Sequence, residues 1–193
     1  MKKIGLTGGI GSGKSYISTV FKKIGFPVFD ADLNAKKCMH ENKELRLAII
    51  NLFGSNIYNN GKLQTRELAS IVFSDQIKLN ALNQVVHPVV TEEFKNWCKN
   101  QDSDFVIKEA AILFESNTYK DLDFIISVSA PIEIRVKRVV SRDGCTANQV
   151  KERMRSQISD KERQKRADFL ILNDGSSLLL PQILEVIDRI KYI

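Results

Sequence analysis

The sequence predicts an α/β domain in which a five-stranded parallel sheet lies between two layers of helices. Short apolar segments rich in β-branched residues recur along the chain, and helix-like sequence separates each from the next. Strands that alternate with helices form parallel sheets with helices on both faces. A chain of 193 residues buries about 70% of its unfolded surface, so its core needs no metal or disulfide. The predicted strands lie at residues 4–7, 26–29, 105–107, 124–128 and 169–172.

The first half of the chain contains two strands and a helical insertion. After the first strand, a glycine cluster leads into a helix over 15–24, where apolar residues recur at helical spacing. The second strand ends at Asp30-Ala31-Asp32. A helical insertion over about residues 31–103 is predicted from helical patterns at 45–53, 65–73 and 77–98.

The region between the last two strands, about residues 131–166, is predicted to be a helical lid. A helix over 132–141 is followed by a break at Asp143-Gly144 and a very polar helical stretch over 146–166. Few apolar residues mean few buried contacts, and such segments open at low cost. A last helix over 177–190 covers the sheet. We expect a single domain over 1–193, with its core at about 1–30, 104–130 and 167–193.

Charge and cysteine content limit the class of protein. The net charge is +6, and residues 135–166 hold 11 Lys and Arg against 4 Asp and Glu, a net charge of +7. That segment faces an anionic partner, either nucleic acid or a phosphorylated small molecule. Cys38, Cys98 and Cys145 are far apart and form no CxxC pair, which argues against a disulfide framework or a zinc site. With no apolar stretch for a signal peptide or a membrane span, we expect a soluble, cytoplasmic protein.

Residues 8–15, Gly-Gly-Ile-Gly-Ser-Gly-Lys-Ser, match the phosphate-loop (P-loop) pattern G-x-x-x-x-G-K-[ST] between a predicted strand and a predicted helix. Glycines let backbone N–H groups turn toward a phosphate, and the helix N-terminus adds its positive dipole end. Lys14 reaches the β- and γ-phosphates, and the Ser15 hydroxyl ligates Mg²⁺. The loop predicts ATP and Mg²⁺ as cofactors, with ATP bound at Gly11, Ser12, Gly13, Lys14 and Ser15.

A small-molecule kinase is the enzyme class that fits this loop best. The N-K-x-D tetrad of guanine-specific GTPases is absent, and a motor or helicase normally needs a larger chain. Asp30 and Asp32 follow the second strand, where ligands collect, and one of them could take a proton from the acceptor. On an extended segment they point to opposite sides, so at most one faces the phosphates. Either can instead cap the helix that follows.

The motifs together resemble the dephospho-CoA kinase family, which catalyses the last step of coenzyme A synthesis. After the P-loop comes Val28-Phe29-Asp30-Ala31-Asp32, and Leu82-Asn83 with His87-Pro88 resembles the family's L-N-x-x-x-H-P. The resemblance covers the whole chain and continues at residues 112–115 (Ile-Leu-Phe-Glu), Arg138, Arg142-Asp143, Gln157, Ala167-Asp168 and 173–175 (Asn-Asp-Gly). The sequence departs from the family's usual Thr, Asp and Pro at Tyr16, Glu109 and Ala111.

This resemblance implies transfer of a phosphoryl group from ATP to the ribose 3′-hydroxyl of dephospho-CoA, giving coenzyme A and ADP. It implies that Asp32 is the general base for that hydroxyl and that Asp30 has a local structural role. His87 and Glu115 are expected to contact the acceptor, and Tyr16 is expected to contact ATP through its backbone N–H.

Arginines of the lid are candidates for phosphate contacts. Arg135, Arg138 and Arg142 lie on one helical face at spacings i, i+3 and i+7, where guanidinium groups can bind phosphate oxygens bidentately. Arg138 is expected to act with Lys14 in catalysis by stabilising the transferring phosphoryl group. Arg142 is expected to hold ATP, with Arg153 or Arg155 as alternatives for holding either nucleotide.

Two further candidates follow strands of the sheet. Glu109, at the end of the third strand, could hold a water molecule of the Mg²⁺ ion. Asn173, just after the fifth strand, is placed to meet the adenine.

Two alternative functions stay open at this point. Another small P-loop kinase, acting on a nucleoside monophosphate or a metabolite such as shikimate or gluconate, would share the loop, although the insertion and the Asp-Ala-Asp motif favour the coenzyme A precursor. A nucleotide-dependent nucleic-acid binder would use the basic segment, but no nucleic-acid motif or aromatic stacking run is recognisable. We therefore expect ATP and dephospho-CoA as partners, without nucleic acid or membrane.

Overall fold

The computed structural model describes residues 1–192, apart from the side chain of Phe73, and its contacts divide the chain into two compact units. One unit is built from Met1–Phe29 and the chain from Gln101 onward, and the other from Asp30–Asn100. The first unit contains the sheet and the P-loop, and the second contains the predicted helical insertion.

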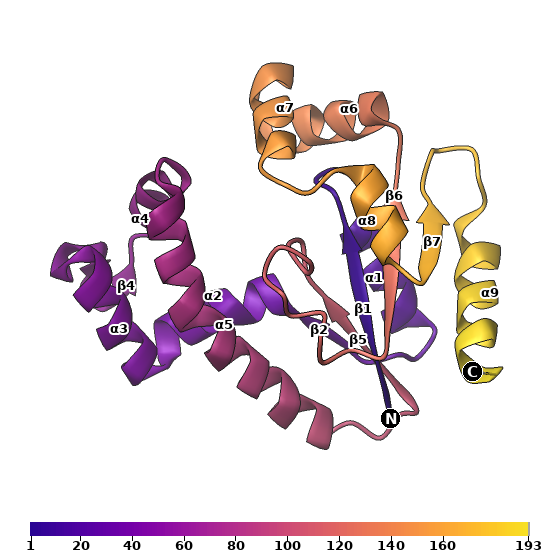
Figure 1. Cartoon of the computed structure of the whole chain (residues 1–193), viewed down its shortest axis with the longest axis horizontal. Coiled ribbons are helices and arrows are strands. Elements are labelled where there is room, and N and C mark those ends of the chain that lie inside the picture. The colour runs from indigo at the N-terminus through magenta and orange to yellow at the C-terminus, as the bar shows by residue number, and fades with distance from the viewer. Residues whose placement is uncertain (193) are drawn as a thin grey trace. The chain divides into compact units, whose positions relative to one another are not determined.

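The predicted parallel sheet is confirmed, with all five predicted strands in the order β2-β5-β1-β6-β7 (Figure 1). The central strand β1 pairs in parallel with β5 and β6, so that Leu6 lies opposite both Glu109 and Ile126. Because parallel strands end at the same edge, the P-loop and Glu109 are brought to one edge of the sheet. The strands are β1 (Lys2–Gly8), β2 (Val28–Asp30), β5 (Phe105–Glu109), β6 (Phe124–Ser129) and β7 (Phe169–Leu172).

One face of the sheet is covered by α1 (Lys14–Lys23) and α9 (Leu179–Tyr192). Their buried side chains join those of β1, β5, β6 and β7 in a single apolar core. Ile17 and Phe21 belong to α1, whereas Ile183 and Ile187 belong to α9. Helix α9 begins two residues later than the sequence predicted, at Leu179.

The opposite face is covered by α8 (Asp160–Arg166), which lies against β6, and by the turns of residues 110–123. Figure 1 shows α8 in front of the strands and α1 behind them. A Cβ on Gly5 of β1 would lie 2.7 Å from a methyl group of Leu113 and 2.8 Å from one of Leu122, so a side chain there would force both leucines to shift. The helices on both faces make the three-layer arrangement that the sequence predicted.

The predicted lid forms α6 (Ile132–Asp143), α7 (Ala147–Arg155) and α8. The single helical stretch expected over 146–166 is wrong, because the chain leaves the helix at Ser156 and starts a new one after Ser159. The Ser159 side chain accepts a hydrogen bond from the Glu162 N–H and caps α8, which is why the second helix begins there.

The second unit is helical, as predicted, with α5 as its longest element. Four apolar residues of α5, Leu82, Val86, Val90 and Phe94, are buried, and α2, α3 and α4 pack on this helix. The helix continues through Pro88. Its elements are α2 (Ala31–Glu41), α3 (Lys43–Phe53), a 3₁₀ helix (Ser55–Ile57), β3 (Tyr58–Asn59), β4 (Lys62–Leu63), α4 (Thr65–Phe73) and α5 (Gln76–Lys99).

A small β-hairpin in this unit was not predicted. Strands β3 and β4 are antiparallel, and Asn60 and Gly61 between them have φ angles of 48° and 76°. Both angles are positive, and an Asn-Gly pair favours this kind of two-residue hairpin turn. The Asn-Gly dipeptide was therefore the sequence signal for the hairpin.

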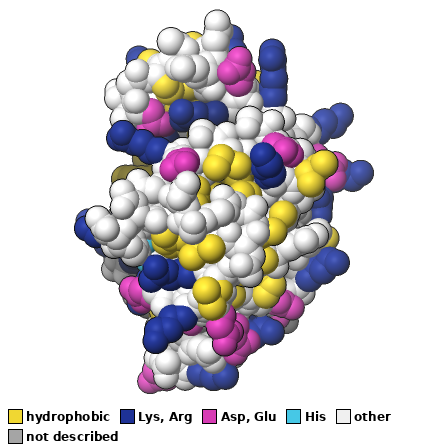
Figure 2. Space-filling view, turned by 90° about the vertical axis from the view of Figure 1, so that its left-hand side faces the viewer, with side chains coloured by type: hydrophobic (Ala, Val, Ile, Leu, Met, Phe, Trp, Pro, Cys, Tyr) yellow, Lys and Arg dark blue, Asp and Glu magenta, His cyan; other side chains and the backbone are white. Residues whose placement is uncertain are grey.

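The surface of the second unit is partly apolar. Leu33, Leu47, Leu52 and Ile77 are exposed large hydrophobic residues. Figure 2, which faces this unit, shows hydrophobic side chains between Lys and Arg side chains. Among residues 1–192, no helix has both the length and the apolar character of a membrane span.

The last residue of β7, Leu172, is hydrogen-bonded to a side chain of α9. Gln182 accepts a hydrogen bond from the Leu172 N–H at 2.8 Å and donates one to the Leu172 carbonyl at 3.1 Å. Leu170 and Leu172 alternate with the buried Phe169 and Ile171 along this strand.

Candidate active site

The P-loop begins with a tight turn and ends at the first turn of α1. The Ser12 N–H donates to the Gly9 carbonyl at 3.0 Å, and Gly11 has a φ of 78°. The φ angle of Ile10 is not positive. A negative φ at the second residue of a turn and a positive φ at the third are typical of type II, so residues 9–12 form a type II turn. Gly13, with a φ of 91°, immediately precedes α1.

Lys14 and Ser15 both contact the carboxylate of Glu109 at the end of β5. Lys14 Nζ lies 2.6 Å from Glu109 Oε1, and Ser15 Oγ donates to the same oxygen at 2.9 Å. Burial acts to raise the pKa of Glu109, but the Lys14 charge and hydrogen bonds from Lys14, Ser18 and Ser15 outweigh it, so the pKa lies below its ordinary value. The carboxylate is therefore held in its charged form beside the loop.

The residues at this point of the loop fit a magnesium ion. A hydroxyl and a carboxylate are hard oxygen donors, and Mg²⁺ in phosphate-transfer sites takes one or two such ligands with water and phosphate oxygens. Ser15 Oγ and Glu109 Oε1 are a pair of this kind, 2.9 Å apart.

Arg138 and Asn173 meet at the P-loop. Asn173 is buried, and its side-chain amide donates to the Ser12 carbonyl at 2.8 Å. Arg138 donates to the Asn173 backbone carbonyl and to its Oδ1, each at 3.1 Å, and to the Ser12 carbonyl at 3.4 Å. Three residues predicted separately, from the loop, the lid and the end of β7, thus form one hydrogen-bonded group.

Arg142 lies further along α6, on the surface. It donates to Asp143 at 2.7 Å, and this hydrogen bond raises the pKa of Arg142. Arg153 of α7 contacts the same carboxylate at 3.1 Å. A cavity of about 520 Å³ runs along α6 and is lined by Ile134, Lys137, Arg138, Ser141 and Arg142.

Arg135 is buried, unlike the other two arginines of the predicted face. Its Nε donates to the Ile10 carbonyl at 2.8 Å, and its guanidinium also contacts Asp160. Burial lowers its pKa, and Asp160 acts against that shift. Helical periodicity placed Arg135 beside Arg138 but could not show that it turns inward to the loop.

Gly9 and Gly11 leave room for this arginine. A Cβ on Gly9 would collide with the Arg135 guanidinium, and a Cβ on Gly11 would lie 2.5 Å from the Arg135 carbonyl oxygen. The α6 helix therefore packs directly on the P-loop.

Two lid residues outside the predicted site also belong to this region. Gln157 Oε1 accepts a hydrogen bond from the Ile10 N–H at 2.9 Å. Arg163, which is fully buried, donates to Asp160 at 2.6 Å and to the Ile158 carbonyl at 2.9 Å. The burial of Arg163 could not be predicted, because nearly all residues of α8 are charged or polar.

Glu115 contacts the lid. Its Oε1 accepts from the Ile158 N–H at 3.1 Å, and Arg163 lies 3.9 Å from the same oxygen. Its other oxygen, Oε2, is buried and has no hydrogen-bond partner among residues 1–192.

Tyr16 lies in the first turn of α1 with its side chain exposed. Its backbone N–H, the group expected to contact ATP, donates to the Gly13 carbonyl at 3.0 Å.

The remaining predicted residues lie in the second unit, from the start of α2 onward. Asp30 is the N-cap of α2, and its side chain accepts from the Leu33 N–H at 2.8 Å, which confirms its local structural role. Asp32 is exposed in the first turn of that helix, so the argument that the two carboxylates alternate along an extended segment is wrong. His87 lies within α5, directly before Pro88.

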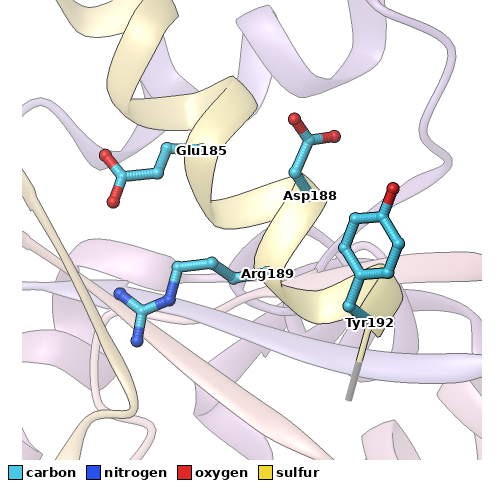
Figure 3. A pocket seen from close by; sticks show the side chains of 4 residues that line it. All are labelled: Glu185, Asp188, Arg189 and Tyr192. Carbon is cyan, nitrogen blue, oxygen red and sulfur yellow. The ribbon is translucent and has the colours of Figure 1, made fainter.

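A second depression of the surface lies on α9, away from these residues in the sequence. Figure 3 shows its lining side chains along the helix, with Glu185 and Arg189 extending to the left of the view and Asp188 and Tyr192 to the right. Arg189 lies over the Phe169 ring, 5.1 Å from its centre. None of the predicted site residues lines this depression.

Comparison with known proteins identifies the family. A family model for dephospho-CoA kinase matches residues 2–178. The chain belongs to the dephospho-CoA kinase family. A dephospho-CoA kinase from Bacteroides fragilis is 41% identical over 186 residues, which cover 96% of this chain and 91% of the relative.

Solved structures agree with the dephospho-CoA kinase assignment. A crystal structure from Thermus thermophilus has a TM-score of 0.86 at 37% identity and covers 96% of this chain and 95% of its own. A dephospho-CoA kinase from Campylobacter jejuni has a TM-score of 0.70 at 28% identity, with 98% of both chains covered. The chain is therefore a kinase, and these comparisons favour dephospho-CoA kinase over the alternative small-metabolite kinases.

Proposed function

We propose that this protein transfers the γ-phosphoryl group of ATP to the ribose 3′-hydroxyl of dephospho-CoA, giving coenzyme A and ADP. The observation that carries the proposal is the match of the dephospho-CoA kinase family model to residues 2–178, which span the P-loop, insertion and lid. Membership of this family supports both ATP and dephospho-CoA as substrates.

The P-loop would receive the phosphates of ATP. Its backbone from Gly11 to Tyr16 surrounds the β-phosphate, while Lys14 turns from Glu109 toward the β- and γ-phosphates. Ser15 and, through water, Glu109 would hold Mg²⁺. When bound, the ion neutralises charge on the phosphate oxygens and aligns them for transfer.

Arg138 would stabilise the phosphoryl group during transfer. Its bonds to Asn173 and to Ser12 fix the guanidinium at the loop, and a preorganised cation does not have to reorient as charge develops. Arg142 lies on the cavity along α6 and would hold ATP, with Asn173 close to the adenine.

Asp32 would take the proton of the 3′-hydroxyl as the general base. It lies in the first turn of α2, beside the positive end of the helix dipole. His87 and Glu115 would contact the acceptor.

The proposal treats both compact units as one kinase domain that works in the cytoplasm, and it includes no nucleic-acid partner.

The test is a product analysis with purified protein and Mg-ATP. We expect dephospho-CoA to gain one phosphoryl group at its 3′-hydroxyl, detected by mass spectrometry of the isolated product, with equal formation of ADP. Shikimate, gluconate and nucleoside monophosphates are the comparison acceptors. Phosphorylation of one of these, with no coenzyme A formed, would overturn the proposal. Retention on mixed DNA and RNA at moderate salt would argue for a nucleic-acid partner.

A further inference from the structure

The peptide groups of Ile10 are held from two sides by the lid. Gln157 Oε1 accepts from the Ile10 N–H at 2.9 Å, and Arg135 Nε donates to the Ile10 carbonyl at 2.8 Å. Arg135 belongs to α6, whereas Gln157 lies between α7 and α8. Two separate parts of the lid thus converge on one residue of the P-loop.

Both holding side chains are themselves fixed. Asp160 contacts the Arg135 guanidinium and accepts from Arg163 at 2.6 Å. The residue after Gln157, Ile158, has its N–H bonded to Glu115 at 3.1 Å and its carbonyl bonded to Arg163 at 2.9 Å. Arg135 and Arg163 are 3% and 2% exposed, so these two guanidinium groups are shielded from water, where hydrogen bonds are stronger, whereas the Asp160 side chain is 34% exposed.

The carbonyl of Ile10 belongs to the central peptide of the type II turn at residues 9–12. Rotation of that peptide by half a turn separates type II from type I turns, as their central dihedral angles show. In a trans peptide the C=O and N–H groups point in opposite directions. The bond from Arg135 to the Ile10 carbonyl therefore turns the Gly11 N–H to the other side of the loop.

We propose that Gln157 and Arg135 are positioning residues that hold the Ile10 peptides so that the P-loop keeps its type II turn before a nucleotide arrives. The inference rests on the proposed function, in which the Gly11 N–H is one of the groups that receive the phosphates of ATP. The two side chains do not touch the reacting atoms and act through the backbone of Ile10.

Loss of this restraint lowers the fraction of molecules whose loop is ready to bind. The apparent dissociation constant rises in inverse proportion to that fraction. Since one hydrogen bond contributes a small net free energy, Gln157→Leu should weaken ATP binding by about 2- to 10-fold. The KM for dephospho-CoA should not change, and kcat at saturating ATP should stay within about 2-fold.

The decisive experiment is a double-mutant cycle on ATP affinity, measured by calorimetry. Ile10→Pro removes the N–H that donates a hydrogen bond to Gln157. Proline is favoured at this second position of a type II turn, so the turn itself should be kept. Ile10→Val is the matched control, because it changes the side chain and keeps the N–H. We expect Gln157→Leu to weaken binding in the wild-type and Ile10→Val backgrounds and to have no further effect with Ile10→Pro.

Hydrogen exchange of the nucleotide-free protein is the second measurement and needs neither proline nor ATP. Exchange in residues 8–15 should quicken in Gln157→Leu and stay at the wild-type rate in Gln157→Glu, whose carboxylate still accepts the bond. Equal weakening of ATP binding by Gln157→Leu in all three backgrounds, or unchanged exchange in the loop, would overturn the inference. Wild-type protein that binds no ATP would instead refute the proposed function, while the exchange result would still test the restraint itself.

Discussion

In the structure Lys14 forms an ion pair with the Glu109 carboxylate, whereas in the proposed reaction it binds the phosphates of ATP. The side chains of Lys14 and Glu109 are 12% and 6% exposed, so this ion pair is largely removed from water. Removing one partner leaves the other charge buried, which is strongly destabilising. The lysine thus contributes to stability as well as to phosphate binding.

Substitution of Lys14 should therefore affect both properties. We expect Lys14→Ala to lower kcat/KM by at least about 10²-fold, because a charge that stabilises the transferring group is lost. The free energy of unfolding should fall by about 3 kcal/mol as Glu109 loses its partner. Steady-state kinetics and urea unfolding measure the two effects, and Lys14→Ala combined with Glu109→Gln should recover part of the stability without activity. Normal turnover in Lys14→Ala would contradict the role of the loop.

Substitution of the two aspartates at the start of α2 should have different effects, on catalysis for Asp32 and on stability for Asp30. Asp32→Asn should lower single-turnover rates by about 10²-fold or more with little change in ATP affinity, because asparagine cannot accept the proton. Asp30→Asn should be nearly neutral, since asparagine caps helices as well as aspartate, whereas Asp30→Ala should cost about 1 kcal/mol of stability. Rapid-quench measurements test this ranking, and the reverse order would transfer the role of base to Asp30.

Residue identities could be predicted from the sequence better than residue contacts. The P-loop pattern and the end of β5 located Lys14, Ser15 and Glu109, since parallel strands end at a common edge. Arg135 could not be placed, because the periodicity of a helix gives its faces but not which face packs on a loop. Charge also suggested exposure, and yet Arg163 is buried because Asp160 and Glu115 lie beside it.

At the scale of elements, the lid consists of parts that are held to different degrees. Helix α6 and helix α8 each bury an arginine in the Asp160 network, whereas α7 buries Val150 alone among its described side chains. Elements with few buried contacts open most easily. We infer that α7 is the part of the lid that moves most.

Hydrogen exchange with bound ligands should show this difference. With an ATP analogue and dephospho-CoA together, exchange in α7 (Ala147–Arg155) should slow by at least about 10-fold, whereas α8 should change little because its bonds exist already. Mass spectrometry of peptic peptides gives both values in one experiment, with β1 as the internal control. Equal slowing in α7 and α8 would mean that the lid moves as one body.

Elements were predicted most reliably where apolar periodicity was strong. The five strands of the sheet and the helices α3, α4 and α5 overlap the predicted ranges, although β2 begins at Val28, two residues later than predicted. The break between α7 and α8 was missed. The end of a helix is visible in a sequence where its apolar repeat ends, and the polar sequence on both sides of Ser156 has no such repeat. The β3–β4 hairpin was missed because its strands have two residues each, too short to show alternation.

At the scale of the whole molecule, acid should destabilise the fold. The pKa values of Glu109, Asp143 and Asp174 all lie below their ordinary values. A carboxyl group with a lower pKa in the folded chain stabilises the fold above its unfolded pKa, and this contribution is lost as the pH falls through the folded value. For Glu109 the loss begins below its ordinary pKa of 4.5.

Thermal unfolding followed between pH 7 and pH 3 tests this expectation. The melting temperature should fall as the pH drops below about 4.5, where the unfolded chain takes up protons first. Glu109→Gln should melt lower at pH 7 and show a weaker dependence on pH, whereas Glu152→Gln, on the surface of α7, should follow the wild type. A pH dependence that is the same in all three proteins would contradict the assignment to Glu109.

The net charge of the lid sequence is larger than the positive charge that the lid exposes to a ligand. Residues 135–166 carry a net charge of +7, but two of these arginines are buried and paired with Asp160. Sequence composition counts such charges as if they were in solvent. The cations that remain for phosphate lie on the surface of α6, on α7, and at Lys161, Lys165 and Arg166 of α8.

The hydrogen bonds from Gln182 to the end of β7 have a consequence for how the protein behaves at high concentration. An edge strand with unpaired backbone groups is a template on which a strand of another molecule can add, and such additions start aggregates. Gln182 occupies both backbone groups of Leu172, and β2 at the opposite edge has only three residues. The Gln182 amide thus takes two backbone groups at the end of β7 that a neighbouring strand could otherwise bond.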